Sequence, residues 1–495
     1  MSSLTLCTGV WISKACHGLC FPKEIHGHSS SRPENSLCPS PCQIIVGYCN
    51  NIMDQDKKII SGFSKLSKRG KIKWIVQNFY KEPEKVMSEL MSYWHSNEEQ
   101  QKILDNFSEN TISNFPMPFG VAPNFIIDQK AYCVPMVIEE SSVVAAASSA
   151  AKFWMSRGGF KTKVISTSKL GQVSFLWEGE ASKLKFHYEK LRQYLMEESF
   201  HITKSMVERG GGIMDIDLID MTDKRAHLYQ LKASFETCDS MGANFINTCL
   251  EQFAKSLVSF FQQSPDFTPE EKEVEIIMSI LSNYTPDCIV RAWVECPVSA
   301  LGKFPGGISA EVFAHRFQTA IQIAELDPYR ATTHNKGIYN GIDAVVIATG
   351  NDFRAIEACG HTYASKDGQY SSLSHCEVKD GQFKFWLDIP LAVGTVGGLT
   401  SLHPIAKRSL ELLENPNANE LMRIIAATGL AQNFSAIRSL VTTGIQQGHM
   451  KMHLQNILTQ LKATKDEELA TVDYFADQIV SFSAVREYLE KLRLS

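Results

Sequence analysis

The chain has 495 residues, which at roughly 150 residues per domain predicts about three domains. With 49 Lys and Arg against 54 Asp and Glu, it lacks the basic excess that sequence-independent nucleic-acid binding needs. We find no run of about 18 uncharged apolar residues, so we expect no membrane span and a cytoplasmic protein.

The first 52 residues differ in composition from the rest. They hold a cluster of cysteines and the polar run 28–35, with almost no periodic pattern. We expect this tail to be disordered. The alternative is a zinc site in the tail. Its candidate ligands are Cys16, Cys20, Cys38, Cys42, His17, His26 and His28.

From about residue 57 the pattern becomes that of a folded protein. Helical spacing predicts helices over 84–103, 143–154 and 244–261. Alternation predicts strands over 124–138, 213–221, 225–235, 275–281 and 288–296, and a hairpin over 161–178 with Gly171 in its turn.

In the second half, a short apolar run over 344–349 ends at Gly350, and a helix is expected from Arg354. Lys379-Asp380-Gly381 predicts a tight hairpin. Beyond Ser409 we expect helices, interrupted at Gly429, Gly444 and Gly448.

These elements predict an α+β fold. We expect a large mixed α/β domain over 53–166 and 283–444, with a smaller α+β domain over 167–282 inserted into it. A C-terminal helical flap would cover 445–495, with hinges at its glycines. No internal repeat is present, which excludes a solenoid.

The common motifs of nucleotide and metal enzymes are absent. The nearest approach to a dinucleotide fingerprint is residues 210–215, but an Asp ends it, so a standard Rossmann domain is excluded. There is no P-loop and no H-E-x-x-H. His449 and His453 lie four residues apart without a third ligand, so we predict no metal.

Adjacent carboxylates, Glu139 and Glu140, follow a strand-like run and precede the Ala/Ser-rich helix. One interpretation is that Glu140 or Ser141 caps that helix. The other is that one carboxyl is a proton donor, which requires it to hold a proton near neutral pH.

A second polar segment, residues 327–341, places Arg330, Lys336 and Asn340 among glycines in an expected loop. This density of polar groups favours a site for a polar, anionic ligand.

Two further residues are candidates for proton and charge chemistry. Asp352, at an expected strand-to-helix turn, is either a helix cap or a partner of Lys336, which would stabilise an oxyanion. His449 follows Gly448 and is either a proton donor on a hinged segment or a surface histidine.

Together, these segments resemble 3-hydroxy-3-methylglutaryl-CoA (HMG-CoA) reductase of the soluble, bacterial-type class II. The matching pieces run in family order over about residues 57–460. They begin ENTI from Glu109, VPMVIEESSVVAAAS from Val134, GGGIMDID from Gly210, DSMGAN from Asp239 and ILSN ending at Asn283, and continue with DPYRATTHNKGIYNGID from Asp327, ATGNDFRAIEA from Ala348, VGTVGGLTSLHP from Val393 and GHMKMH from Gly448.

The resemblance implies four catalytic roles. Glu140 matches the catalytic acid, and Lys336 the lysine that stabilises the oxyanion of the reduced thioester. Asp352 matches the central aspartate of the network. His449 matches the histidine that protonates the departing CoA thiolate.

The resemblance also implies binding residues. Contacts to the HMG moiety would come from Arg330, Asn340, Ser142 and Asn283. The nicotinamide cofactor would be held by Gly210, Gly211, Gly212, Asp239, Met241, Gly242 and Asn244. The family builds this cofactor domain as an α+β module, which accounts for the missing Rossmann fingerprint.

Several further expectations follow from the family. The reaction is reduction of HMG-CoA to mevalonate and CoA, or the reverse oxidation, in a homodimer or higher oligomer. The cofactor is NADPH or NADH; Thr203 and Lys204, with no clear ribose-binding acid nearby, favour NADPH. Ser141 and Ser113 depart from the residues usual in the family.

Two rival functions remain at this point. One is a different acyl-CoA enzyme on the same scaffold. The other is a catalytically silent acyl-CoA or nucleotide-binding protein, against which the complete catalytic set argues.

Overall fold

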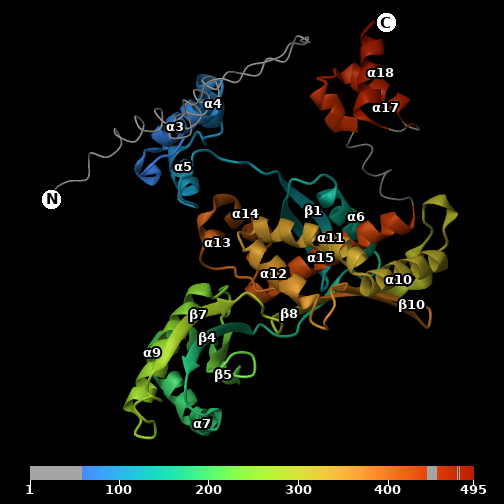
Figure 1. Ribbon diagram of the computed structural model, residues 1–495. Helices are drawn as coiled ribbons and strands as arrows, with labels where there is room; N and C mark the ends of the chain where they lie inside the picture. The colour runs from blue at the N-terminus through green and yellow to red at the C-terminus, as the bar shows by residue number, and fades with distance from the viewer. Residues whose placement is uncertain (1–57, 443–453, 476–477, 479, 495) are drawn as a thin grey trace, which may run out of the picture. The chain divides into compact units, whose positions relative to one another are not determined.

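The computed structural model describes residues 58–442, 454–475, 478 and 480–494 (Figure 1). The described residues form two compact units, one of residues 58–93 with 109–113 and one of the remaining described residues. The N-terminal tail, with its candidate zinc ligands, lies outside the described residues, as do His449, His453, Gly444 and Gly448.

The described part of the first unit is a small helical segment. Ile72 and Val76, one turn apart on the same helix face, are its buried side chains. Its elements are η1 (Phe63–Lys65), α3 (Lys68–Phe79) and α4 (Pro83–Ser92).

The larger part of the second unit is built on a four-stranded antiparallel sheet, in the order β3-β8-β10-β9. Asp380 and Gly381 join β9 to β10 in a two-residue turn, both with positive φ, which confirms the predicted hairpin. The strands are β3 (Lys161–Val164), β8 (Ile289–Pro297), β9 (Ser374–Lys379) and β10 (Gln382–Pro390).

One continuous core lies between this sheet, the hairpin of β1 and β2, and the surrounding helices, with Trp154, Phe317 and Phe434 at its centre. These elements are α5 (Glu98–Asp105), β1 (Phe119–Ile127), β2 (Lys130–Val137), α6 (Val143–Met155), η2 (Val298–Leu301), η3 (Pro305–Gly307), α10 (Ala310–Leu326), α11 (Pro328–Ala348), α12 (Phe353–Tyr363), α13 (Leu399–Leu402), α14 (Pro404–Leu412) and α15 (Ala418–Val441).

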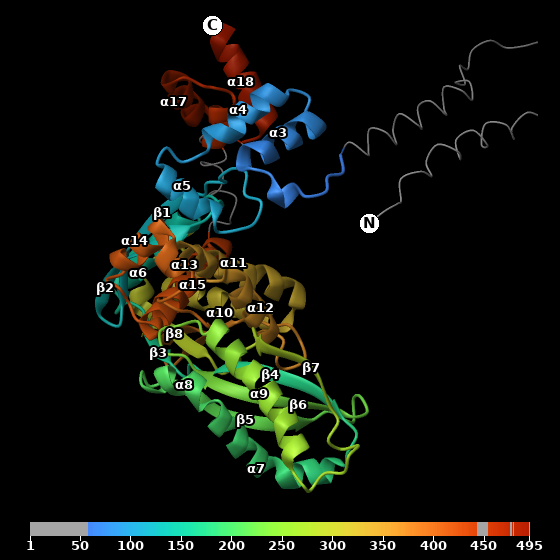
Figure 2. The same ribbon diagram turned by 90° about the vertical axis from the view of Figure 1, so that its left-hand side faces the viewer.

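A second antiparallel sheet, in the order β5-β6-β4-β7, has a core of its own. The helices α7 and α9 lie against one face of it (Figures 1 and 2), and side chains such as Phe235 and Phe253 fill the space between. The elements are β4 (Lys169–Trp177), α7 (Ala181–Glu198), α8 (Phe200–Val207), β5 (Gly212–Asp220), β6 (Leu228–Glu236), α9 (Ala243–Gln263) and β7 (Val274–Ser282).

At the C-terminus, residues 454–460, α17 (Lys465–Tyr474) and α18 (Phe482–Leu494) share a small core that includes Leu458 and Leu489. No helix in the described ranges has the length and apolarity that a membrane crossing requires.

The mixed α+β class is confirmed, but two local expectations were wrong. Residues 161–178 do not form a hairpin, because β3 and β4 belong to different sheets. Gly171 lies inside β4, where a Cβ would come within 2.5 Å of Leu250. The glycine therefore lets α9 pack closely on the sheet and does not mark a turn.

The expected loop over 327–341 and the apolar run after it form a single 21-residue helix, α11. Its glycines had suggested a loop, but a Cβ at Gly341 would lie 2.8 Å from the Cβ of Gln432, so this glycine serves close packing of α11 on α15. The buried run of Val345 and Val346 had suggested a strand, and tertiary packing overrides that propensity.

Two helix boundaries also differ from expectation. Residues 84–103 form two helices, α4 and α5, and not one. Gly429 does not interrupt α15, because it lies where Ile342 packs, at 2.7 Å from the position of a Cβ.

Candidate active site

The helix α11 presents one polar face to a pocket. Arg330, Thr333, Lys336 and Asn340 follow each other at spacings of three and four residues, and Gly337 lies four residues after Thr333, which places all five along one side of a helix. These residues line a pocket together with the turn before α6 and the second half of α15, which we call the α11–α15 pocket.

Glu140 reaches this pocket from the turn between β2 and α6. Ser142, the N-cap residue of α6, adopts a left-handed conformation with φ 75° and also lines the pocket. The Ser142 side chain makes no capping hydrogen bond to α6. Glu140 and Ser142 instead line the pocket together with residues of α11.

Lys336 and Glu140 are in direct contact. The Lys336 Nζ donates to Glu140 Oε2 at 2.6 Å, and Asn340 Nδ2 lies 3.4 Å from the same oxygen. Both charged side chains keep substantial solvent access, at 59% and 39% of their side-chain surface. An ion pair this exposed contributes little to stability, so its place in a pocket points to function.

Arg330 supplies a second cation without a protein partner in the described chain. Burial lowers the pKa of its guanidinium. A half-buried guanidinium in a pocket is suited to a carboxylate, which it can bind through two parallel hydrogen bonds.

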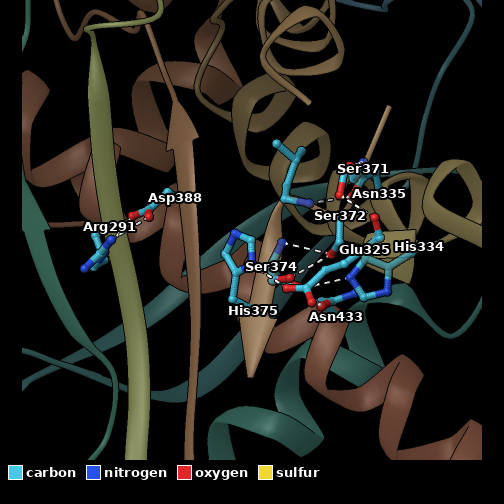
Figure 3. A network of polar contacts seen from close by, with 11 residues as sticks. Arg291, Glu325, His334, Asn335, Ser371, Ser372, Ser374, His375, Asp388 and Asn433 are labelled. Atoms are coloured by element: carbon cyan, nitrogen blue, oxygen red, sulfur yellow. Dashed lines mark hydrogen bonds and ion pairs between the residues drawn. The ribbon is translucent and has the colours of Figure 1, made fainter. Parts of the chain in front are cut away.

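A buried polar network fixes α11 beneath this pocket (Figure 3). His334 Nε2 lies 2.7 Å from Ser374 Oγ, which donates to Asn433 Oδ1 at 2.8 Å. Next to it, Asn335 donates to the backbone oxygen of Ser371 at 2.9 Å. Burial lowers the pKa of His334 to about 3, so the imidazole is neutral and acts as a structural link between α11, β9 and α15.

A second pocket, which we call the α9–α12 pocket, lies where three turns meet. It is lined by residues 240–245, 350–354, Gly394 and 396–400. The α9 helix begins there after Gly242, at φ 88°, and its first backbone N–H groups have no partner within the helix. Such a helix terminus favours an anion.

Asp239 holds this pocket together. Its carboxylate accepts from the backbone N–H of Ala418, the first residue of α15, at 2.8 Å. Its backbone oxygen accepts from Thr395 N, also at 2.8 Å. The predicted cofactor residues Met241, Gly242 and Asn244 line the pocket, whereas Asp239 positions the loop that carries them.

Asp352 lies in the α9–α12 pocket, and within one chain it does not contact Lys336. It accepts from the N–H groups of Arg354 and Ala355 at the start of α12 and pairs with the Arg354 guanidinium at 3.1 Å. Lys336 lies twelve residues before the end of α11, a distance of about 18 Å along the helix axis. The expected Asp352–Lys336 pair is therefore absent from the single chain.

Asn283 also lies away from the other predicted HMG contacts. It follows β7 and lines a third pocket with Lys169, Met241 and Ala243, which we call the Lys169 pocket.

The glycine run 210–212 forms the turn from α8 to β5 and is not among the residues lining the α9–α12 pocket. A Cβ at Gly211 would lie 2.6 Å from the backbone oxygen of Glu236, so close strand packing accounts for that glycine.

Thr203 is 5% exposed, with its hydroxyl donating to Phe200 O, because helical periodicity turns it inward with Met206. The cofactor contact expected of Thr203 stays a prediction, and it would have to be made by a side chain that is largely buried. Lys204, next to it on α8, is exposed.

The sequence reasoning missed residues on two segments. Gln432, Asn433 and Arg438 of α15 line the α11–α15 pocket, and Gly394 with residues 396–400 line the α9–α12 pocket. The two adjacent amides within the otherwise apolar run of α15 were the available signal. His449 lies outside the described residues.

Comparisons with known proteins show the family of the chain. The profile of the family hydroxymethylglutaryl-coenzyme A reductase matches residues 71–454. The reductase of Archaeoglobus fulgidus is 36% identical over 436 residues, which cover 88% of this chain and 94% of the relative.

Among solved structures, the HMG-CoA reductase of Streptococcus pneumoniae superposes with a TM-score of 0.64 at 34% identity, covering 88% of this chain and 100% of that one. A second structure, of the class II enzyme from the same organism bound to NADPH in open conformations, gives a TM-score of 0.63 at 34% identity, covering 83% and 99%.

The comparisons define an oxidoreductase, and its structure has two separate polar-lined pockets, the α11–α15 pocket and the α9–α12 pocket. The chain belongs to the hydroxymethylglutaryl-coenzyme A reductase family.

Proposed function

We propose that this protein reduces HMG-CoA to mevalonate and CoA with two equivalents of NADPH. The contact that carries the proposal is the Lys336–Glu140 pair, which sets an ammonium and a carboxyl group side by side on the face of α11 that lines the α11–α15 pocket. Two protons and two hydrides are consumed for each thioester reduced to the alcohol. When bound, the cofactor supplies the hydrides.

In this reaction Lys336 donates a hydrogen bond to the thioester oxygen, which becomes an oxyanion as the carbonyl carbon is reduced. Collapse of the hemithioacetal breaks the carbon–sulfur bond, and His449 gives a proton to the leaving thiolate. Glu140, whose carboxylate first takes up a proton from solvent once Lys336 donates to the substrate oxygen, gives that proton to the aldehyde oxygen as it becomes the alcohol. Arg330 binds the free carboxylate of the HMG group.

A basic patch supports CoA as the leaving group. Arg438 and Ser439 line both the α11–α15 pocket and a neighbouring hollow that also contains Arg157 and Lys303. The lining of this hollow includes three cations and, in the described chain, no carboxylate. Phosphate groups are the natural partners of such a cluster.

The α9–α12 pocket fits the cofactor. The N-terminus of the 21-residue α9 suits the diphosphate. Gly394 lets its own loop pack against the loop before α9, because a Cβ there would lie 2.4 Å from Met241 N. NADPH, rather than NADH, is supported by the similar S. pneumoniae structure, which is bound to NADPH.

The separation of Asp352 from Lys336 supports a homodimer. One chain places Glu140, Lys336 and Arg330 in one pocket and Asp352 with the cofactor loop in another. We infer that a second copy brings its Asp352 to the Lys336 of the first, so that each active site draws on both chains.

The test is the loss of reduced-cofactor absorbance when purified protein is mixed with HMG-CoA, run in parallel with NADPH and with NADH. We expect turnover that requires HMG-CoA and is faster with NADPH. Silence with both cofactors from a folded protein would contradict the proposal and favour a binding protein. Faster turnover with NADH would reverse the cofactor assignment alone.

A further inference from the structure

The first unit concentrates its positive charge on a short stretch of chain. Residues 58–81 hold six lysines, one arginine and no carboxylate, although the whole chain has a net charge of −5. The acidic side chains of this unit begin only at Glu82, which pairs with Lys85 at 2.9 Å. An uninterrupted basic segment in an acidic protein indicates that it binds an anionic surface.

The start of α3 and its periodicity place an aromatic side chain away from the interior of the unit. The Ser67 hydroxyl caps the helix by accepting from Gly70 N at 3.1 Å. Ile72 and Val76 are buried. Trp74 is two residues from each of them, and two residues turn a helix by about 200°, so the indole is directed away from the buried face.

Three aromatic rings form a row around the Trp74 side chain, with a lysine at each end. The Trp74 ring lies 5.5 Å, centroid to centroid, from the rings of both Phe63 and Phe79. The Lys71 Nζ lies 6.0 Å from the centre of the Phe63 ring, and the Lys58 Nζ lies 5.9 Å from the centre of the Phe79 ring. We call these five residues the basic aromatic patch.

The residues next to this patch in the sequence add both charge and exposed apolar surface. Lys65, Lys73 and Lys81 are exposed, and none of them forms an ion pair or a side-chain hydrogen bond with another described residue. Ile59 is 76% exposed and Tyr80 48%. Exposed apolar side chains among unpaired lysines fit a partner that has apolar and anionic parts close together.

We propose that the basic aromatic patch docks the protein on the surface of a lipid bilayer that contains anionic headgroups. The lysines lie among the lipid phosphates and carboxylates, and Ile59 and Phe79 enter the boundary between headgroups and acyl chains. The long lysine side chains suit this depth, because their aliphatic stems contact apolar groups while the ammonium groups stay in the polar layer. The contact does not depend on the proposed reductase activity.

The geometry of the rings favours a lipid surface over single-stranded nucleic acid. Stacking of bases requires flat, open ring faces. The rings of the patch instead meet edge to face, at interplanar angles of 64° and 69°, and an ammonium lies over each terminal ring. The aliphatic side chain of Ile59 offers no stacking surface, whereas it can insert among acyl chains.

The experiment measures co-sedimentation of full-length protein, kept under reducing conditions, with lipid vesicles. One vesicle type is phosphatidylcholine with about 30% phosphatidylserine, and the other is phosphatidylcholine alone. Both are tested at about 0.1 M and about 1 M salt. We expect binding to the anionic vesicles at low salt, strong weakening at high salt because the charges are screened, and no binding to the neutral vesicles.

The variants replace exposed side chains that make no printed contact within the unit, so the fold is preserved. Lys73→Gln combined with Lys81→Gln should weaken binding to the anionic vesicles about 25-fold, since each lysine near such a surface contributes about five-fold. The matched control combines Lys224→Gln with Lys379→Gln, two exposed lysines of the second unit, and should bind like the wild type. Ile59→Ser should weaken binding about five-fold, because apolar insertion is lost.

Three results would overturn the proposal. The first is wild-type protein that binds both vesicle types equally or binds neither. The second is an equal effect of the two double variants, which would mean that the patch is not the contact. The third comes from a parallel titration with polyuridylate RNA at low salt: tighter binding to this RNA than to the anionic vesicles would assign the patch to single-stranded nucleic acid.

Discussion

At Lys336 the protein holds an ammonium against a carboxylate while leaving both open to solvent. The 2.6 Å contact with Glu140 keeps the two charges balanced before substrate arrives. A thioester oxygen that enters the pocket competes for the same ammonium, and the hydrogen bond to it strengthens as negative charge develops. This difference between ground state and transition state is what makes such a donor catalytic.

Replacing Lys336 by Met tests that role. We expect kcat with HMG-CoA to fall at least about 100-fold, because the developing oxyanion loses its charged donor. The affinity for NADPH and the Tm should change little, since the ion pair is exposed and lies outside the α9–α12 pocket. Stopped-flow or steady-state cofactor oxidation measures kcat. Fluorescence titration measures the affinity for NADPH, and calorimetry measures the Tm.

The control is Lys407→Met on α14, an exposed lysine that does not line the α11–α15 pocket. Turnover by Lys336→Met at the rate of this control would remove Lys336 from the mechanism.

At the scale of elements, the long helices α11 and α15 determine the substrate pocket by how closely they pack. Gly341 of α11 faces Thr428 and Gln432 of α15, and Gly429 of α15 faces Ile342 of α11. The close approach brings Gln432 and Asn433 level with the Lys336 face. The two glycines act through their lack of a side chain, although the sequence had suggested a loop around Gly341 and a helix break at Gly429.

We therefore expect opposite effects from two alanines on α11. Gly341→Ala should lower stability by about 1–3 kcal/mol, because its Cβ would meet the α15 backbone at 2.8 Å. Gly337→Ala should raise stability by up to about 1 kcal/mol, since no atom lies within 4 Å of its Cβ and alanine favours a helix. Thermal unfolding of each variant measures its change in stability. A destabilisation of similar size in both variants would contradict the packing argument.

The sequence was sufficient for elements whose signal is local. Asp380-Gly381 specified its turn, alternation found β5 and β6, and spacing found α9. It also placed Glu140 and Lys336 in one site before their contact was known. The sequence-based prediction was wrong for α11, whose helix is determined by long-range packing. Its glycines and β-branched residues suggested a loop and a strand, but in the structure they serve contacts with α15.

The pairing of Asp352 was beyond the sequence for another reason. Local signals identified it as a cap, which it is, but its expected partner Lys336 lies far along the preceding helix.

At the scale of the whole molecule, the predicted catalytic set is divided between two pockets of one chain. If each active site joins the Lys336 of one copy to the Asp352 of another, two different inactive variants should repair each other. We expect Lys336→Met and Asp352→Asn to be inactive alone. In a mixed dimer, one site then carries both substitutions and the other carries neither.

Co-expression of the two variants in equal amounts should therefore restore about a quarter of wild-type activity, since half of the dimers are mixed and half of the sites in each mixed dimer are intact. Differently tagged copies, purified through both tags, should reach about half. The control pairs Lys336→Met with Glu140→Gln, two residues that meet within one chain and would fall in different sites of a mixed dimer. If neither combination regains activity, all catalytic residues act within one chain, and a closing movement of that chain must bring Asp352 to Lys336.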